Sequence, residues 1–203
     1  MTTGRTQSFS QLGGHRMLDL VNTVHWRLSP DRRRDALADY GDILDWALQL
    51  GILNDAETES LRDAHLRDPR RAARVVDEVR ALRDAVYAAL YESADPGPVV
   101  DAYRAAISEG VLAPGARGWR WTFPLDLDLP LRRIALDAVD LLTDDRQTSL
   151  AQCQDAECGW VFLDTSPRHN RRWCDSADCG NRNRVREYYN RRRDGDRERA
   201  TGV

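Results

Sequence analysis

The sequence predicts a mainly α protein, in which an N-terminal helical domain with a small β hairpin precedes a C-terminal, treble-clef-like module built on four cysteines. Three observations predict this fold class. Apolar residues recur at helical spacing in residues 1–150, and all of the cysteines lie between Cys153 and Cys179. The charge also changes sign, because residues 1–150 hold 19 Arg against 24 acidic residues, whereas residues 151–203 hold 11 Arg against 9. We therefore divide the chain into a helical domain (1–147), a cysteine module (148–193) and a disordered tail (194–203).

Capping residues and apolar periodicity predict the elements of the helical domain in order. Asn54 is a favourable N-cap, and Asp68 followed by Pro69 begins the strongest helical pattern. Gly51 is expected to end the helix predicted over residues 40–50. Alternating large aromatic residues predict that 119–123 is a strand of the small hairpin. The predicted helices cover residues 15–28, 40–50, 54–65, 69–92, 98–109 and 129–142.

The composition is that of a folded protein without a membrane anchor. With 203 residues, of which 41% are hydrophobic, the chain can bury the core of one or two domains. It has no run of about 18 apolar residues, and residues 1–16 lack the apolar segment of a secretory signal. We therefore expect a cytoplasmic protein. A reducing cytoplasm disfavours disulfides, so the clustered cysteines indicate metal binding or redox chemistry.

The cysteine spacing indicates a structural zinc site. Cys153 and Cys158 form one C-x4-C pair, and Cys174 and Cys179 form a second. Four thiolates in two short loops suit the tetrahedral coordination of Zn²⁺, whereas an iron–sulfur cluster and a redox pair are weaker alternatives because no C-x-x-C is present. His169 is then a surface residue and not a ligand. One zinc ion per chain is the predicted cofactor.

The residues around the cysteines predict a hairpin and a helix. The apolar stretch 160–163 suits a strand, 165–167 suits a turn, and 171–173 suits the returning strand. A helix then begins at Cys179, with Val185 as its expected core contact. A knuckle, a hairpin and a helix that carries the last ligand make a treble-clef-like four-cysteine zinc finger.

The cysteine module is strongly basic. Residues 168–193 contain nine Arg, opposed only by Asp175, Asp178 and Glu187. Arginine binds phosphate and guanine in bidentate fashion, and asparagine suits adenine, so this module is predicted to bind double-stranded DNA. The alternatives are a solvated helix, packing on the acidic N-terminal domain, or a protein-interaction module for an acidic partner. The candidate nucleic-acid-binding residues are Arg168, Arg171, Arg172, Asn181, Arg182, Arg184, Arg186, Arg191, Arg192 and Arg193.

Arg182 has two possible roles in this module. Because it follows the ligand Cys179 by three residues, zinc would fix its backbone, and its side chain could read a base in DNA. Alternatively, it could hold the finger together by hydrogen bonding close to the zinc.

Two stretches of sequence resemble known families. The run from Cys158 to Arg182 is similar to the CGNR zinc fingers, named for the tetrapeptide that stands here at residues 179–182. The segments LDLVNTVHWR and GDILDWALQLGIL resemble the ABATE domain, which precedes this finger in bacterial proteins regarded as stress-induced transcription regulators. The resemblance implies zinc on the four cysteines and DNA binding by the arginines around Arg171, Arg172 and Arg182. The chain is thus expected to be a bacterial transcription regulator.

The helical domain contains a candidate ligand pocket. Asn22 and Thr23 are polar residues in an otherwise apolar stretch, and His25 follows them. They could line a pocket for a small-molecule effector, or they could cap a helix and pack without a ligand. A homodimer is compatible with both, since regulators commonly double a short site by two-fold symmetry.

The sequence offers no support for an enzyme. It contains no P-loop, G-x-G-x-x-G, G-x-S-x-G or H-E-x-x-H motif. A zinc ion held by four thiolates also keeps no open position for a catalytic water. We therefore expect a regulator with no catalytic residues.

Overall fold

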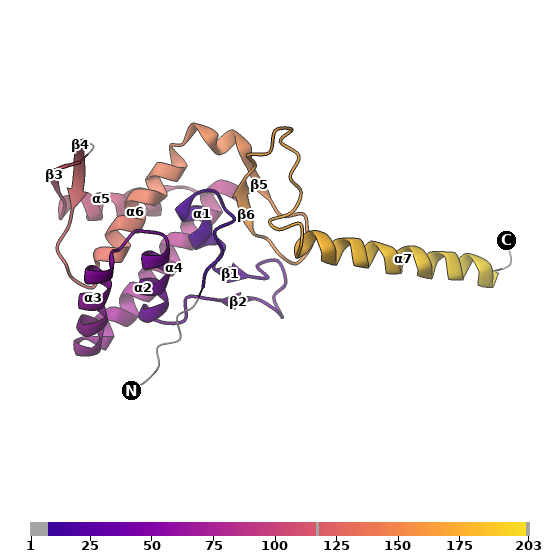
Figure 1. The fold of residues 1–203 in the computed structure, drawn as a ribbon, viewed down its shortest axis with the longest axis horizontal. Coiled ribbons are helices and arrows are strands. Elements are labelled where there is room, and N and C mark those ends of the chain that lie inside the picture. Colours follow the sequence, from indigo (N-terminus) through magenta and orange to yellow (C-terminus); the bar gives the residue numbers. More distant parts are fainter. Residues whose placement is uncertain (1–7, 117, 202–203) are drawn as a thin grey trace.

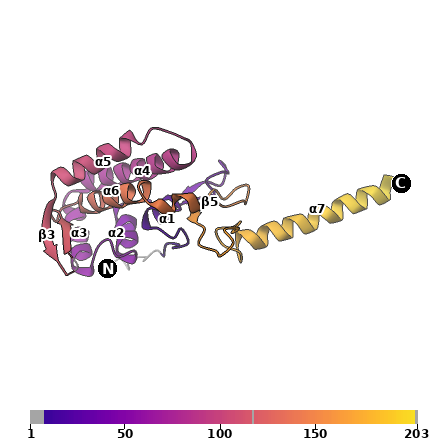
Figure 2. The same ribbon diagram turned by 90° about the horizontal axis from the view of Figure 1, so that it is seen from above.

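Helices dominate the computed structural model, which describes residues 8–116 and 118–201 (Figure 1). Six helices gather in one body, and a seventh, α7, projects away from this body beyond β5 and β6 (Figures 1 and 2). The predicted fold class is therefore confirmed. The helices are α1 (Arg16–Val21), α2 (Tyr40–Gln49), α3 (Asp55–Arg67), α4 (Pro69–Tyr91), α5 (Gly97–Ser108), α6 (Leu129–Leu142) and α7 (Cys179–Thr201).

Side-chain caps fix where the helices of the body begin. Asp39 and Asn54 each form a capping box at the start of α2 and α3, and Asp68 caps α4 in front of Pro69. The apolar stripe of α4 is buried in the shared core, with Val75, Val79 and Val86 fully covered. The predicted starts of these helices are confirmed because their signals are local.

In the described part of the chain, three two-stranded antiparallel hairpins accompany the helices. The pair β3 (Val111–Gly115) and β4 (Gly118–Thr122) confirms the hairpin predicted around 119–123. The other pairs are β1 (Val24–His25) with β2 (Arg34–Asp35), and β5 (Leu150–Gln152) with β6 (Val161–Leu163). Each hairpin has only two strands, which are too few for independent stability.

The first predicted helix is shorter than its periodicity suggests. The pattern favours a helix over 15–28, but α1 ends at Val21 and the chain continues as β1. The reason is tertiary: the Asn22 side chain bonds the backbone of Val161, and β1 pairs with β2. Contacts distant in sequence override the local helical preference.

The strand β6 has a different partner from the one predicted. It pairs with β5, with Leu150 opposite Leu163, and not with residues 171–173. The Asp164 carboxylate accepts the backbone N–H groups of Ser166 and Arg171, so the returning segment forms a loop. Successive β6 residues face opposite sides: Val161 and Leu163 belong to the core of the helical body, whereas Phe162 packs with the cysteines.

Helix α7 is longer and less covered than the sequence predicts. It continues to Thr201, through most of the segment 194–203 that is predicted to be disordered, while residues 202–203 lie outside the described part of the chain. Extending an existing helix costs less than nucleating one, which explains the continuation. Val185, predicted to contact the core, is 46% exposed. Among the residues that the structure describes, no helix combines the length and apolar character needed to span a bilayer.

The buried carboxyl of Asp19 gives the fold a testable pH dependence. Asp19 is 5% exposed and accepts the Gly13 backbone N–H at 2.8 Å. Burial raises the pKa of Asp19 to about 6. The folded state therefore favours the protonated carboxyl. The ionised carboxylate destabilises the folded state, and this effect is absent below about pH 4 and complete above about pH 6.

Replacing Asp19 with asparagine is expected to stabilise the protein at pH 7 by about 1–3 kcal/mol, because the amide can still accept the Gly13 bond without carrying charge. The advantage should shrink as the pH falls towards 4. Urea unfolding of both proteins between pH 4 and 7.5 measures this. A variant that is less stable at pH 7, or whose advantage is independent of pH, would contradict the assigned protonation.

Candidate metal centre and nucleic-acid interface

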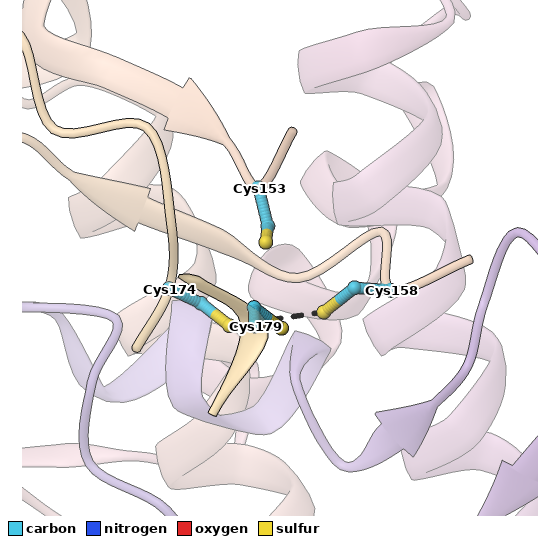
Figure 3. Close-up of side chains that lie close together, drawn as sticks. All are labelled: Cys153, Cys158, Cys174 and Cys179. Atoms are coloured by element: carbon cyan, nitrogen blue, oxygen red, sulfur yellow. Dashed lines mark hydrogen bonds between the residues drawn. The ribbon is translucent and has the colours of Figure 1, made fainter. Parts of the chain in front are cut away.

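The four cysteines come together from separate elements (Figure 3). Cys153 follows β5, Cys158 precedes β6, Cys174 lies in the loop after β6, and Cys179 begins α7. Their Sγ atoms all lie within 4.8 Å of one another, with 3.7 Å between Cys158 and Cys174 and 3.4 Å between Cys174 and Cys179. A tetrahedral site with Zn–S bonds of about 2.3 Å needs S–S separations of about 3.8 Å. The cluster can therefore hold one zinc ion.

The chemistry of this donor set also fits a cation. All four thiols are buried, and they are too close to ionise together without compensating charge. The proximity of Cys158 lowers the pKa of Cys153, and the proximity of Cys153 raises the pKa of Cys158, because the thiol of one stabilises the thiolate of the other. Burial raises the pKa of Cys179. A bound Zn²⁺ would supply the missing positive charge and hold all four as thiolates.

Arg182 lies against the cluster and not in open solvent. Its Nη2 donates to Cys179 Sγ at 2.8 Å, and its Nη1 donates to Asp178 at 2.5 Å. A cationic donor at a thiolate ligand offsets part of the negative charge of a four-thiolate zinc site. Of the two roles that the sequence leaves open for Arg182, this geometry favours holding the finger together.

A buried carboxylate that the sequence analysis missed connects α7 to the first cysteine pair. Asp155 is fully buried between Cys153 and Cys158, and it accepts hydrogen bonds from Arg182 at 3.4 Å and from Asn183 at 2.9 Å. A buried carboxylate is tolerated where such donors satisfy it. Asp155 therefore fixes the rotation of α7 about its axis relative to the metal site.

Backbone contacts join the first cysteine pair to the helical body. Arg27 N donates to Cys158 O at 3.0 Å, and Leu28 N donates to Glu157 O at 3.2 Å. Gly159 makes this approach possible: its φ is +69°, and a Cβ there would lie 2.9 Å from Arg27 Cβ. Any other residue at position 159 would therefore strain this junction.

The Asn22 side chain makes a two-bond polar link across the same junction. Its amide donates to Val161 O at 2.8 Å and accepts from Val161 N at 2.9 Å, so it pairs with β6 as a neighbouring strand would. Trp160 Nε1 adds a bond to Val24 O at 3.1 Å. The finger is therefore docked on the helical body through directional bonds as well as apolar contacts.

Trp26, which the sequence analysis also missed, contacts two guanidinium groups. Arg32 lies 3.5 Å and Arg182 lies 4.4 Å from its ring. Its φ of 53° is rare for a bulky residue, so the surrounding contacts hold it in a strained conformation. Trp26 thereby links the β1–β2 connection directly to the arginine beside the zinc ligands.

Each of the two parts of the chain matches a model of a known protein family. Residues 14–145 match ABATE, described as "Putative stress-induced transcription regulator". The chain belongs to the ABATE family. Residues 149–192 match the CGNR zinc finger, so both resemblances noted in the sequence are confirmed, in the same order. No curated protein matches the chain. The assignment to a regulator family with a zinc finger rests on these two matches.

The structure places the three candidate ligand-pocket residues in different surroundings. Asn22 and Thr23 are each 3% exposed, and Thr23 Oγ1 donates to Leu20 O while accepting from Arg83. His25 lines a cavity of about 230 Å³, together with Trp26, Trp160 and Arg182. Internal hydrogen bonds thus account for Asn22 and Thr23, and an effector stays a prediction.

The candidate nucleic-acid-binding residues separate into two groups. Like Arg182, Arg171 is engaged internally: it donates to the carbonyls of Trp173 and Cys174 and covers the Phe162 ring at 4.0 Å. The others are exposed, and they include Arg186, which lies 3.7 Å from Glu157. The exposed group consists of Arg168, Arg172, Asn181, Arg184, Arg186, Arg191, Arg192 and Arg193.

Proposed function

We propose that this protein is a zinc-dependent transcription regulator whose CGNR finger binds double-stranded DNA and whose ABATE domain controls that binding. The observation that carries the proposal is a set of exposed arginines that form no ion pair with any carboxylate of residues 8–116 and 118–193, the residues whose side chains the structure describes. The set consists of Arg168, Arg172, Arg184, Arg191, Arg192 and Arg193.

This charge favours an anionic partner. Clustered cations repel one another unless counter-charge is near, and phosphates are natural counter-charges for arginine. Helix α7 also projects from the helical body, so most of its length is free of neighbouring elements (Figure 1). A single α-helix has the width that the major groove of B-DNA admits.

An acidic protein partner is the second candidate. Tyr188 and Tyr189 on α7 are 51% and 60% exposed, and exposed tyrosines are common in protein interfaces. Such a partner would be recognised through specific pairs and apolar contacts. Its binding would depend less steeply on salt than that of DNA.

The salt dependence of duplex binding tests the proposal. If about five arginines neutralise phosphates, the slope of log K against log salt should be about −4 to −5, a loss of about 250- to 1000-fold between 50 and 200 mM salt. Binding is measured by fluorescence anisotropy with the full-length, zinc-loaded protein. No detectable duplex binding, or binding that does not respond to salt, would reject the proposal.

A matched pair of variants locates the contacts. Replacing Arg191, Arg192 and Arg193 with glutamine is expected to reduce the magnitude of the slope by up to about 3. The control replaces Arg67, Arg70 and Arg74, three exposed arginines of the ABATE domain, and should leave the slope unchanged. Equal effects of the two variants would place the DNA elsewhere.

A further inference from the structure

The rotation of α7 is fixed by the residues at its first turns. Cys179 is a zinc ligand, Arg182 and Asn183 bond Asp155, and Arg186 lies toward Glu157. Because successive helical residues are rotated by about 100°, these four side chains fall within about 100° of the helix circumference. We call this sector the inner face of α7.

The opposite side of the same turns has a different composition. Asn181, Arg184, Val185 and Tyr188 fall within another sector of about 100°, centred roughly opposite the inner face. All four are exposed. We call this sector the outer face of α7.

The polar groups of the outer face are largely free to bind a partner. The Arg184 guanidinium gives one hydrogen bond to Ser176 O at 3.2 Å, which leaves most of its five N–H donors free. Among the described residues, no hydrogen bond engages the Asn181 side chain. By contrast, the guanidinium of Arg182 on the inner face donates hydrogen bonds to Cys179, Asp178 and Asp155.

Resting on the DNA binding proposed above, we infer that the outer face of α7 reads bases in the major groove, with Asn181 on adenine and Arg184 on guanine. Asparagine is bidentate to adenine N6/N7, arginine is bidentate to guanine O6/N7, and Val185 suits a thymine methyl group. The occupant is thus duplex DNA, to which the positive charge of α7 is complementary.

The spacing of these two residues limits the sequence that they read. Asn181 and Arg184 are separated by about 4.5 Å along the helix axis, and base pairs rise by about 3.4 Å. The two contacts therefore fall on adjacent base pairs or are separated by one pair. The arginines further along α7, Arg191 to Arg193, lie beyond this reading segment and add phosphate contacts.

Selection and affinity measurements test this inference. Preferred duplexes are first selected from random sequence by the full-length, zinc-loaded protein, and are expected to contain an adenine and a guanine at that spacing. Affinity for the preferred duplex and for an unrelated duplex is then measured for Asn181→Ala, Arg184→Ala and the control Arg186→Ala. Arg186 is a matched control because it is also an exposed arginine of α7, about 200° away on the inner face. Zinc content is measured in each variant to verify the fold.

The expected effects differ between the two faces. Arg184→Ala and Asn181→Ala should each weaken binding to the preferred duplex by about 5- to 150-fold, with a much smaller effect on the unrelated duplex. Arg186→Ala should weaken both duplexes equally. Unchanged preference in Arg184→Ala, lost preference in Arg186→Ala, or a wild-type protein that selects no sequence would each overturn the inference while leaving salt-dependent DNA binding intact. A wild-type protein that binds no duplex would overturn both proposals.

Discussion

Removing zinc is expected to unfold the CGNR finger while most of the ABATE domain keeps its helices. The finger has a small core of its own, in which Phe162 packs with the four cysteines and with partly buried Ala151, Trp160 and Trp173. Structural zinc contributes on the order of 10 kcal/mol in small fingers, more than so small a cluster could supply by apolar burial. Without metal, the thiols would also lose the charge that stabilises their ionised form.

Three measurements check this expectation. Elemental analysis should give one zinc per chain, a chelator should remove part of the helical circular dichroism signal, and added zinc should restore it. Cys174→Ser should behave like the chelated protein, whereas Ser176→Ala, an exposed serine of the same loop, should keep its zinc. A protein isolated without metal, or one whose structure is unchanged by chelation, would show that the cysteines do not hold a structural zinc ion.

Replacing Asn22 with leucine is expected to destabilise the protein by about 2–5 kcal/mol. The change leaves both the N–H and the carbonyl of Val161 without the Asn22 amide, in a region where Val161 is fully buried. Each unsatisfied buried polar group costs about 1–3 kcal/mol. Since these bonds join the finger to the ABATE domain, the two parts should also unfold less cooperatively.

Urea unfolding, followed by tryptophan fluorescence and by circular dichroism, measures both effects. The control is Asn170→Leu, an exposed asparagine of the finger, which should change stability by less than about 0.5 kcal/mol. If Asn22→Leu has the stability of the wild type, the docking role is wrong. A ligand-binding role for Asn22 would then regain support.

Local signals in the sequence predicted most of the helical body. The capping boxes at Asp39 and Asn54 and the Asp68-Pro69 start need only neighbouring residues, so helix starts there follow from the sequence. The cysteine spacing likewise predicted the zinc cluster, because its four ligands lie in two short loops. The starts of α2, α3 and α4 and the metal centre were therefore accessible without a structure.

Contacts between distant segments were not predictable in this way. Asn22 bonds a strand 139 residues away, and that contact helps end α1 where periodicity favours more helix. The pairing of β6 with β5 and the loop bonds of Asp164 to Arg171 likewise have no local signature in the sequence. Asp155, an acidic residue between two cysteines, carries no signature that distinguishes a buried partner from a solvated one. The sorting of arginines into internal and exposed groups was inaccessible for the same reason.

The central claim is that the metal centre orients α7 for DNA. The affinity for duplex DNA before and after zinc removal tests this claim most directly. Anisotropy at one fixed salt concentration should show tight binding by the zinc-loaded protein, a large loss after chelation, and recovery when zinc is restored. Without zinc, the residues of α7 are no longer held in place but still carry their charged arginines, so some salt-sensitive non-specific binding should remain. Equal affinity and equal sequence preference with and without zinc would contradict the claim.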